Sequence, residues 1–251
     1  MEVTVLGCGT NIPNPRKAGP SFYIKDRSDS ILLDMGPNSL LNMVRANINR
    51  LKIENILFTH FHSDHFSDLV IFLGNRDYEI GLKQINLPKL NIFIPKGYRQ
   101  IINGLAKFPG IRRILPKARI KDLWNSSLKI SGFKVKTLPL SHWKTKEVGV
   151  RIEKHSKSIA YTGDTGVCNN LYKLFKDADT AIVECAFPKK MNIAGHLNSG
   201  QVGKVAQKAG AKTLVLTHIY PFAPDSQIKK EVQENFKGKV ILARDLLRIK
   251  V

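Results

Sequence analysis

Apolar residues along the chain fall into short, nearly unbroken runs that end in polar or glycine-containing turns. The clearest runs occupy residues 3–6, 55–58, 91–94, 181–183 and 213–216. Runs of this length between turn signals are typical of buried strands. The pattern therefore predicts sheets whose strands are covered by other layers.

Other segments have the pattern of hairpin or half-buried strands. Residues 22–24 and 30–33 form one candidate pair, and residues 148–152 and 157–161 form another. Residues 133–138 alternate between apolar and polar side chains, which is the strand period. Several strands therefore follow one another in the middle of the chain.

Three stretches space their apolar residues at helical intervals. They are residues 38–48, with Leu40, Leu41, Val44 and Ile48; residues 66–74, with Phe66, Leu69, Val70 and Leu73; and residues 199–209. Asn198 and Gln201 form a capping-box-like start for the third, and Gly210 suits its C-cap. Helices that alternate with strands, next to a run of consecutive strands, predict two mixed sheets face to face with helices outside. The chain shows no linker, so we expect one domain over residues 1–251.

The charge is the unusual feature of the composition. Lys and Arg number 40 against 20 Asp and Glu, a formal net charge of +20. Such a charge attracts polyanions, which favours nucleic acid or another phosphate-rich partner. A lysine-rich proteome would give the same composition without such a partner.

The termini and cysteines bear on location. Residues 1–5 lack the basic and apolar regions of a signal peptide, and no apolar run approaches the ~20 residues of a membrane span. The three cysteines, Cys8, Cys168 and Cys185, have no paired spacing. We therefore expect a cytoplasmic protein with no membrane partner.

One segment concentrates the positive charge. Between Lys96 and Lys121 there are eight basic residues and no acidic one: Lys96, Arg99, Lys107, Arg112, Arg113, Lys117, Arg119 and Lys121. Tyr98, Phe108 and Trp124 lie among or beside them, a combination that suits a phosphate backbone with stackable bases. A solvated helix face with aromatic residues in the core is the alternative interpretation.

The densest group of chemically active side chains is Thr-His-Phe-His-Ser-Asp-His at residues 59–65. It lies where a predicted strand ends and a predicted helix begins. Alternate residues of an extended segment point the same way, so His60 and His62 can bind one ion together, while Asp64 and His65 face a second position. Imidazole and carboxylate without thiolate suit Zn²⁺ or another borderline divalent metal.

Further histidines and one aspartate follow other predicted strands. His142, His196 and His218 lie at strand ends or in the turns beside them, and Asp164 lies between glycines at another. A lone histidine is usually structural, but six at equivalent positions indicate a shared site. His155, in a polar hairpin turn, is expected to be exposed.

These residues together resemble the metallo-β-lactamase superfamily. Residues 59–65 are similar to its signature, and His142, Asp164 and His218 follow in its order. The resemblance implies an α/β fold, a four-layer αββα sandwich, with two Zn²⁺ ions, or Mn²⁺ or Fe²⁺, at the sheet edges. It implies that His60, His62 and His142 bind one metal, that Asp64, His65 and His218 bind the other, and that Asp164 bridges them. A histidine instead of a glutamate at position 62 favours hydrolysis over di-iron redox chemistry.

The C-terminal half is similar to the ribonuclease Z group and its phosphodiesterase relatives. Gly195-His196-Leu197-Asn198, before the capped helix, resembles that group's sixth-histidine motif, which implies that His196 contacts the scissile phosphate or protonates the leaving oxygen. Glu184 is then either the residue that orients His196 or a surface carboxylate. Asn198 stands where ribonuclease Z usually has Thr. Only residues 143–163 separate His142 from Asp164, so the tRNA-gripping arm of that group is missing.

The leading hypothesis is a dinuclear hydrolase, a ribonuclease Z-like endonuclease that acts on RNA or other nucleic acid. A metal-bound hydroxide attacks phosphorus, Asp64 orients or deprotonates the water, and His196 assists the leaving alcohol. The missing arm favours instead a small cyclic phosphodiester or an arylsulfate. A non-catalytic, metal-containing nucleic-acid-binding protein is a third hypothesis, and thioesterase or lactamase use of the same ligands stays open. A homodimer is expected by analogy with relatives.

Overall fold

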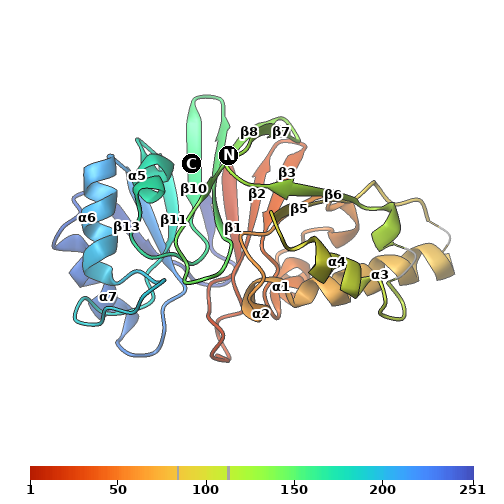
Figure 1. Cartoon of the computed structure of the whole chain (residues 1–251), viewed down its shortest axis with the longest axis horizontal. Helices are drawn as coiled ribbons and strands as arrows, with labels where there is room; N and C mark the ends of the chain where they lie inside the picture. Colours follow the sequence, from red (N-terminus) through yellow and green to blue (C-terminus); the bar gives the residue numbers. More distant parts are fainter. Residues whose placement is uncertain (84, 112–113) are drawn as a thin grey trace.

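The computed structural model describes residues 1–83, 85–111 and 114–251, and over these residues two sheets lie face to face (Figure 1). The first sheet has the order β14 (Arg248–Lys250), β1 (Glu2–Gly7), β2 (Ser21–Asp26), β3 (Asp29–Leu33), β4 (Asn55–Leu57), β5 (Asn91–Pro95) and β6 (Arg119–Leu123). The second has the order β13 (Lys239–Leu242), β12 (Thr213–Thr217), β11 (Thr180–Glu184), β10 (Lys157–Tyr161), β9 (Val148–Lys154), β8 (Phe133–Pro139) and β7 (Ser127–Ile130).

Helices cover the outer face of each sheet. The first sheet carries α1 (Ser39–Arg45), α2 (Ser63–Phe66), α3 (Asp68–Lys83) and α4 (Arg99–Leu105), with the short 3₁₀ turns η1 (Arg50–Lys52) and η2 (Leu115–Lys117). The second carries α5 (Asn169–Phe175), α6 (Ser199–Ala209) and α7 (Asp225–Gln233). The expected αββα sandwich is thereby confirmed. Across the described ranges, no helix is both long and apolar enough to cross a membrane.

Three apolar cores separate the four layers. Side chains such as Val5 and Leu57 of the first sheet pack against Val150 and Ile182 of the second. The opposite faces of the same strands pack against the helices, because successive side chains of a strand point to opposite faces. Burial on both faces explains the unbroken apolar runs of the central strands.

Strand direction determines where the polar strand ends collect. In the second sheet, β8 and β10 are both antiparallel to β9, while β11, β12 and β13 run parallel to β10. In the first sheet, β3 to β6 are parallel, and two antiparallel pairings give β1 the same direction. The carboxyl ends of these strands therefore gather at one edge of each sheet, which is where α/β proteins build sites.

Two helices end at other residues than the sequence predicts. The helix after Pro37 ends at Arg45, so Ile48 lies beyond it, and Val44 is 53% exposed instead of buried. Asn42 faces inward in its place and donates its amide to the Leu6 carbonyl at 2.8 Å. The helix expected to end near Gly74 continues to Lys83.

The start and end of α6 are as predicted. The Asn198 side chain accepts the Gln201 N–H at 2.9 Å, and the Gln201 side chain accepts the Asn198 N–H at 3.0 Å. Gly210 ends the helix with φ 74°, a left-handed conformation that favours glycine. The capping box holds the loop that contains His196 directly before the helix.

Candidate metal centre

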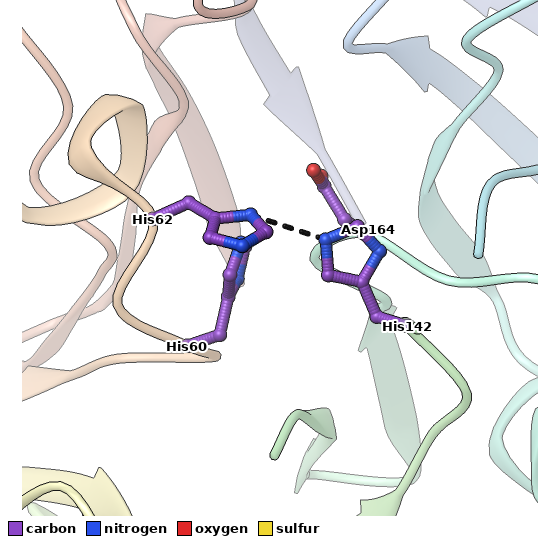
Figure 2. Close-up of side chains that lie close together, drawn as sticks. All are labelled: His60, His62, His142 and Asp164. Atoms are coloured by element: carbon purple, nitrogen blue, oxygen red, sulfur yellow. Dashed lines mark hydrogen bonds between the residues drawn. The ribbon is translucent and has the colours of Figure 1, made fainter. Parts of the chain in front are cut away.

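All seven side chains expected to bind metal lie together at the shared edge of the two sheets. His60 follows β4, and His62, Asp64 and His65 lie at or in α2; His142, Asp164 and His218 follow β8, β10 and β12. Ligand atoms of one group, His60, His62, His142 and Asp164, lie within 4.8 Å of one another (Figure 2). Asp64, His65 and His218 form a second group by the same measure. These two groups divide the seven residues as the sequence implies, and Asp164, His196 and His218 form a third group that meets the same measure.

In the first group, one ring nitrogen of His62 lies close to one ring nitrogen of His142, and the second nitrogen of each ring contacts another group. His62 Nδ1 and His142 Nε2 are 3.1 Å apart, the contact drawn as a dashed line in Figure 2. His142 Nδ1 donates to the Gly195 carbonyl at 2.7 Å, so its Nε2 carries the free lone pair. Thr145 Oγ1 lies 3.3 Å from His62 Nε2 and so orients that ring. Each ring thereby presents one nitrogen to the same point.

Glu147 contacts two members of the first group, Asp164 and His60. It is fully buried, and its Oε1 accepts the Asp164 N–H at 2.7 Å. Its Oε2 lies 3.5 Å from His60 Nδ1. Gly163 makes this approach feasible, because a Cβ at that position would lie 2.1 Å from Glu147 Oε1 and its φ is +60°. Burial raises the pKa of Glu147 well above its usual range.

Asp34, another fully buried carboxylate, supports the second group through His65. Its Oδ2 lies 2.8 Å from His65 Nδ1 and accepts the hydroxyls of Thr59 and Tyr161 at 2.8 and 2.7 Å. The carboxylate fixes the ring of His65 with Nε2 toward the cluster, an arrangement common behind metal-binding histidines.

Asp164 lies between the two groups. Its Oδ1 is 3.3 Å from His65 Nε2, and its Oδ2 is 3.4 Å from His218 Nε2. His218 Nε2 also lies 3.2 Å from Asp64 Oδ2. Asp164 also belongs to the first group by the distances between ligand atoms, so it is placed to contact both positions.

Burial lowers the pKa of three of the histidines. The pKa of His60 falls well below its usual range, that of His62 also falls, and that of His142 falls to about 4. Neutral imidazole is the form that binds metal. Burial also opposes the charged form of His65, but Asp164 and Asp34 together outweigh it and raise the pKa of that ring.

The buried polar atoms of the cluster fit divalent metal ions. Among the described residues, His60 Nε2, His65 Nε2 and Asp164 Oδ1 are buried without a hydrogen-bond partner. Leaving such atoms unpaired is costly, so several pointing at one place indicate an absent ligand. Imidazole nitrogen and carboxylate oxygen suit a borderline cation.

His196 lies beside the cluster on the loop between β11 and α6. Its ring centroid is 4.8 Å from that of His142 and 5.9 Å from that of His218. Its Nδ1 is 3.1 Å from Glu184 Oε1, which leaves Nε2 free for another partner. Burial opposes the protonated ring, but Glu184 offsets this and raises the pKa of His196.

The surface interpretation of Glu184 is wrong, because the side chain is fully buried. Its Oε1 also accepts the Thr165 N–H at 2.5 Å, and its Oε2 accepts the Leu197 N–H at 3.2 Å. These backbone donors hold the carboxylate behind His196. His155, by contrast, is exposed as expected, with 60% of its side chain accessible.

Sequence reasoning missed the supporting residues Asp34, Thr145 and Glu147. Asp34 carried a usable signal, since it follows a buried apolar run directly, as the ligands do. Glu147 stands after alternating lysines and threonine in a polar stretch and has no such signal. Its role depends on the fold.

The described basic side chains of the segment from Lys96 to Lys121 lie on the surface. Lys96, Lys107, Lys117, Arg119 and Lys121 are exposed, while Arg112 and Arg113 lie outside the described residues. Tyr98 packs on Phe61 at 5.0 Å, but Phe108 and Trp124 are exposed. The alternative interpretation, with these aromatic residues in the core, is therefore wrong for Phe108 and Trp124.

This fold and this cluster define the class of protein. Residues 30–219 match the model of the beta-lactamase superfamily domain, and the chain belongs to that superfamily. The predicted superfamily is therefore confirmed.

Individual relatives narrow the comparison. The probable metallo-hydrolase YhfI of Bacillus subtilis (strain 168) is 27% identical over 254 residues, covering 97% of each chain. The Ribonuclease Z of Mycolicibacterium gilvum (strain PYR-GCK) is 27% identical over 281 positions, covering 100% of this chain and 96% of that one. The predicted similarity to ribonuclease Z is thus also confirmed.

Solved structures agree on the fold. The crystal structure of B. subtilis YhfI superposes with a TM-score of 0.84 at 24% identity, over 99% of this chain and 98% of that one. A diphosphatase from the PhnP family gives a TM-score of 0.79 at 19% identity, over 100% and 97%.

Proposed function

We propose that this protein is a cytoplasmic, metal-dependent phosphodiesterase that resembles ribonuclease Z and acts on RNA or other nucleic acid. The observation that carries the proposal is the buried Glu184–His196 pair beside a seven-residue metal cluster. Relatives named Ribonuclease Z at 27% identity support the same reaction class.

The ligand sets assign roles to the residues. His60, His62 and His142 would hold one divalent metal, Asp64, His65 and His218 a second, and Asp164 both. Zn²⁺ is the first candidate, with Mn²⁺ or Fe²⁺ as alternatives. Such metals supply water activation and charge neutralisation at the phosphate when bound.

The remaining steps belong to side chains. Glu184 holds Nδ1 of His196, so Nε2 is the atom that donates a proton to the departing oxygen. Asp64 Oδ2 lies 3.2 Å from His218 Nε2. The role we assign to Asp64 is to orient the attacking water or to accept its proton. The net charge of +20 and the exposed lysines between Lys96 and Lys121 attract the polyanion.

Replacement of His196 tests the proposal with two substrates. We expect His196→Ala to lower kcat by about 10²–10⁴-fold on an RNA diester, whose alkoxide leaving group needs a proton. The loss on bis(4-nitrophenyl) phosphate should be much smaller, because nitrophenolate leaves without one. His155→Ala, at the exposed hairpin histidine, is the matched control. Equal losses on both substrates at unchanged metal content would reject the role of His196.

A small phosphodiester is the second candidate, and the connection between β9 and β10 favours it. The two strands are joined by a tight turn at His155 and Ser156. Strands and turn fill most of residues 143–163, the interval in which ribonuclease Z would carry its arm. The fold shared with a diphosphatase of the PhnP family also supports it. Assays of pre-tRNA and cyclic nucleotides side by side, with a salt titration, separate the two. Weak RNA binding that is insensitive to salt would favour the small substrate.

A further inference from the structure

Trp143 lies beside the candidate metal centre, directly after the candidate ligand His142. Its ring centroid is 4.9 Å from that of His142 at an interplanar angle of 32°, and 5.0 Å from that of His196 at 90°. The residue is nevertheless 57% exposed. A large apolar ring therefore touches both a candidate ligand and the candidate acid while much of its surface stays open.

The turn that carries Trp143 is held at both ends by the metal cluster. Thr145 N–H donates to the His142 carbonyl at 2.8 Å and closes a four-residue turn. His142 faces the cluster at one end, and the Thr145 hydroxyl orients His62 at the other. The position of the ring is thus tied to the geometry of the ligands.

The backbone at Trp143 is strained, and the surrounding loop accommodates the strain. Trp143 is the first central residue of the turn and has φ 44°, where glycine is strongly preferred and a bulky residue is an outlier. Gly195 of the facing loop leaves room for it, since a Cβ there would lie 2.9 Å from the Trp143 nitrogen and 3.0 Å from its Cγ. Strain of this kind collects at functional sites, where the surrounding structure maintains it.

We propose that Trp143 is a stacking platform for the nucleobase next to the scissile phosphate. The inference rests on the proposed phosphodiesterase function and names the part of the substrate that this site recognises. A planar base stacked on the exposed part of the indole would lie next to the metal cluster. The phosphate of the same nucleotide would then reach the candidate metal ligands. Lys144 and Lys146, both exposed, follow Trp143 in the chain and suit the adjoining phosphates.

Fluorescence tests binding independently of turnover. The chain has two tryptophans, so Trp124→Phe leaves Trp143 as the only one. Thymidine 5′-monophosphate, added to this zinc-loaded variant, should quench the emission in a saturable way, while methyl phosphate should not. Equal effects of the two probes, or no quenching by the nucleotide, would overturn the proposal.

Kinetics test specificity with two diesters that share one leaving group. These are thymidine 5′-(4-nitrophenyl phosphate) and methyl 4-nitrophenyl phosphate. Trp143→Leu should lower the ratio of kcat/KM for the thymidine ester over the methyl ester by about 5- to 100-fold, mainly through KM. Trp143→Phe should retain most of the ratio, and Tyr78→Leu, at an exposed aromatic residue of α3, should leave it unchanged.

The outcomes separate the two proposals. An unchanged ratio in Trp143→Leu, with both esters still hydrolysed, overturns the stacking role and leaves the phosphodiesterase function standing. If the metal-loaded wild type hydrolyses neither ester, the proposed function fails, and the fluorescence titration alone decides whether Trp143 binds a base.

Discussion

The two sheets contribute to the metal centre in different ways. The first sheet supplies four candidate ligands within one strand-to-helix connection, His60 to His65. The second supplies three from the ends of separate strands, His142, Asp164 and His218. The first contribution depends on one turn of chain and the carboxylate of Asp34 behind it. The second depends on the register of the whole sheet, so damage to the two halves should have different consequences.

Asp164→Ala should have the largest effect, because Asp164 belongs to the first ligand group and its oxygens also approach His65 and His218 of the second. We expect hydrolysis of bis(4-nitrophenyl) phosphate to fall below detection and the metal content to fall at both positions. Metal analysis of the purified variant beside the turnover assay checks this. His155→Ala is the control for loss of a polar side chain, and undiminished turnover of Asp164→Ala at verified metal content would reject the two-metal arrangement.

Asp34→Asn should damage mainly the second ligand group, Asp64, His65 and His218, because Asp34 supports His65. Asp34 Oδ2 serves His65, Thr59 and Tyr161 together, and an amide cannot accept all three bonds in the same way. Removing such support from a metal-binding histidine typically costs about 10–100-fold in metal affinity. Competition with a graded chelator should show one of two metal equivalents released earlier than in the wild type.

The control for Asp34→Asn is Asp245→Asn. Asp245 is a partly buried carboxylate that also accepts several hydrogen bonds, from Ala18, Asn42 and Cys8, but it lies outside the cluster. It should lower stability without changing metal release. Simultaneous early release of both equivalents in Asp34→Asn would show that the two ligand groups do not respond separately.

The same difference between the two sheets explains which residues of the metal centre could be predicted from the sequence. The signature at residues 59–65 is dense because its ligands share one turn, so spacing alone indicated a metal site. His142, Asp164 and His218 were found only because each follows a buried strand and their order resembles a known family. Glu147 follows no such rule: its partner Asp164 is brought to it by the pairing of β9 with β10. The outward position of Val44 was equally hidden, because it depends on Asn42 binding the end of β1.

Replacement of Glu147 should have a smaller effect and tests the part of the centre that the second sheet supplies. Glu147→Ala removes the acceptor of the buried Asp164 N–H, and an unpaired buried donor costs about 1–3 kcal/mol. Glu147→Gln retains an acceptor oxygen and should lose much less. Chemical denaturation of both variants, metal-free and metal-loaded, measures the difference. Equal stability of the Ala and Gln variants would show that this hydrogen bond does not hold the loop of Asp164.

The smallest effect concerns the surface between Lys96 and Lys121, which belongs to the first sheet's side of the molecule. Lys107 and Lys121 are exposed, so the double change to Ala should weaken RNA binding modestly and about equally for all sequences. For each lysine that binds a phosphate, its removal should reduce the slope of log Kd against log salt by at most about 1. The matched control is Lys173→Ala with Lys204→Ala, which removes the same charge from α5 and α6 on the opposite outer face. If both pairs reduce the slope equally, RNA responds only to net charge, and the polymer does not use this side of the molecule in particular.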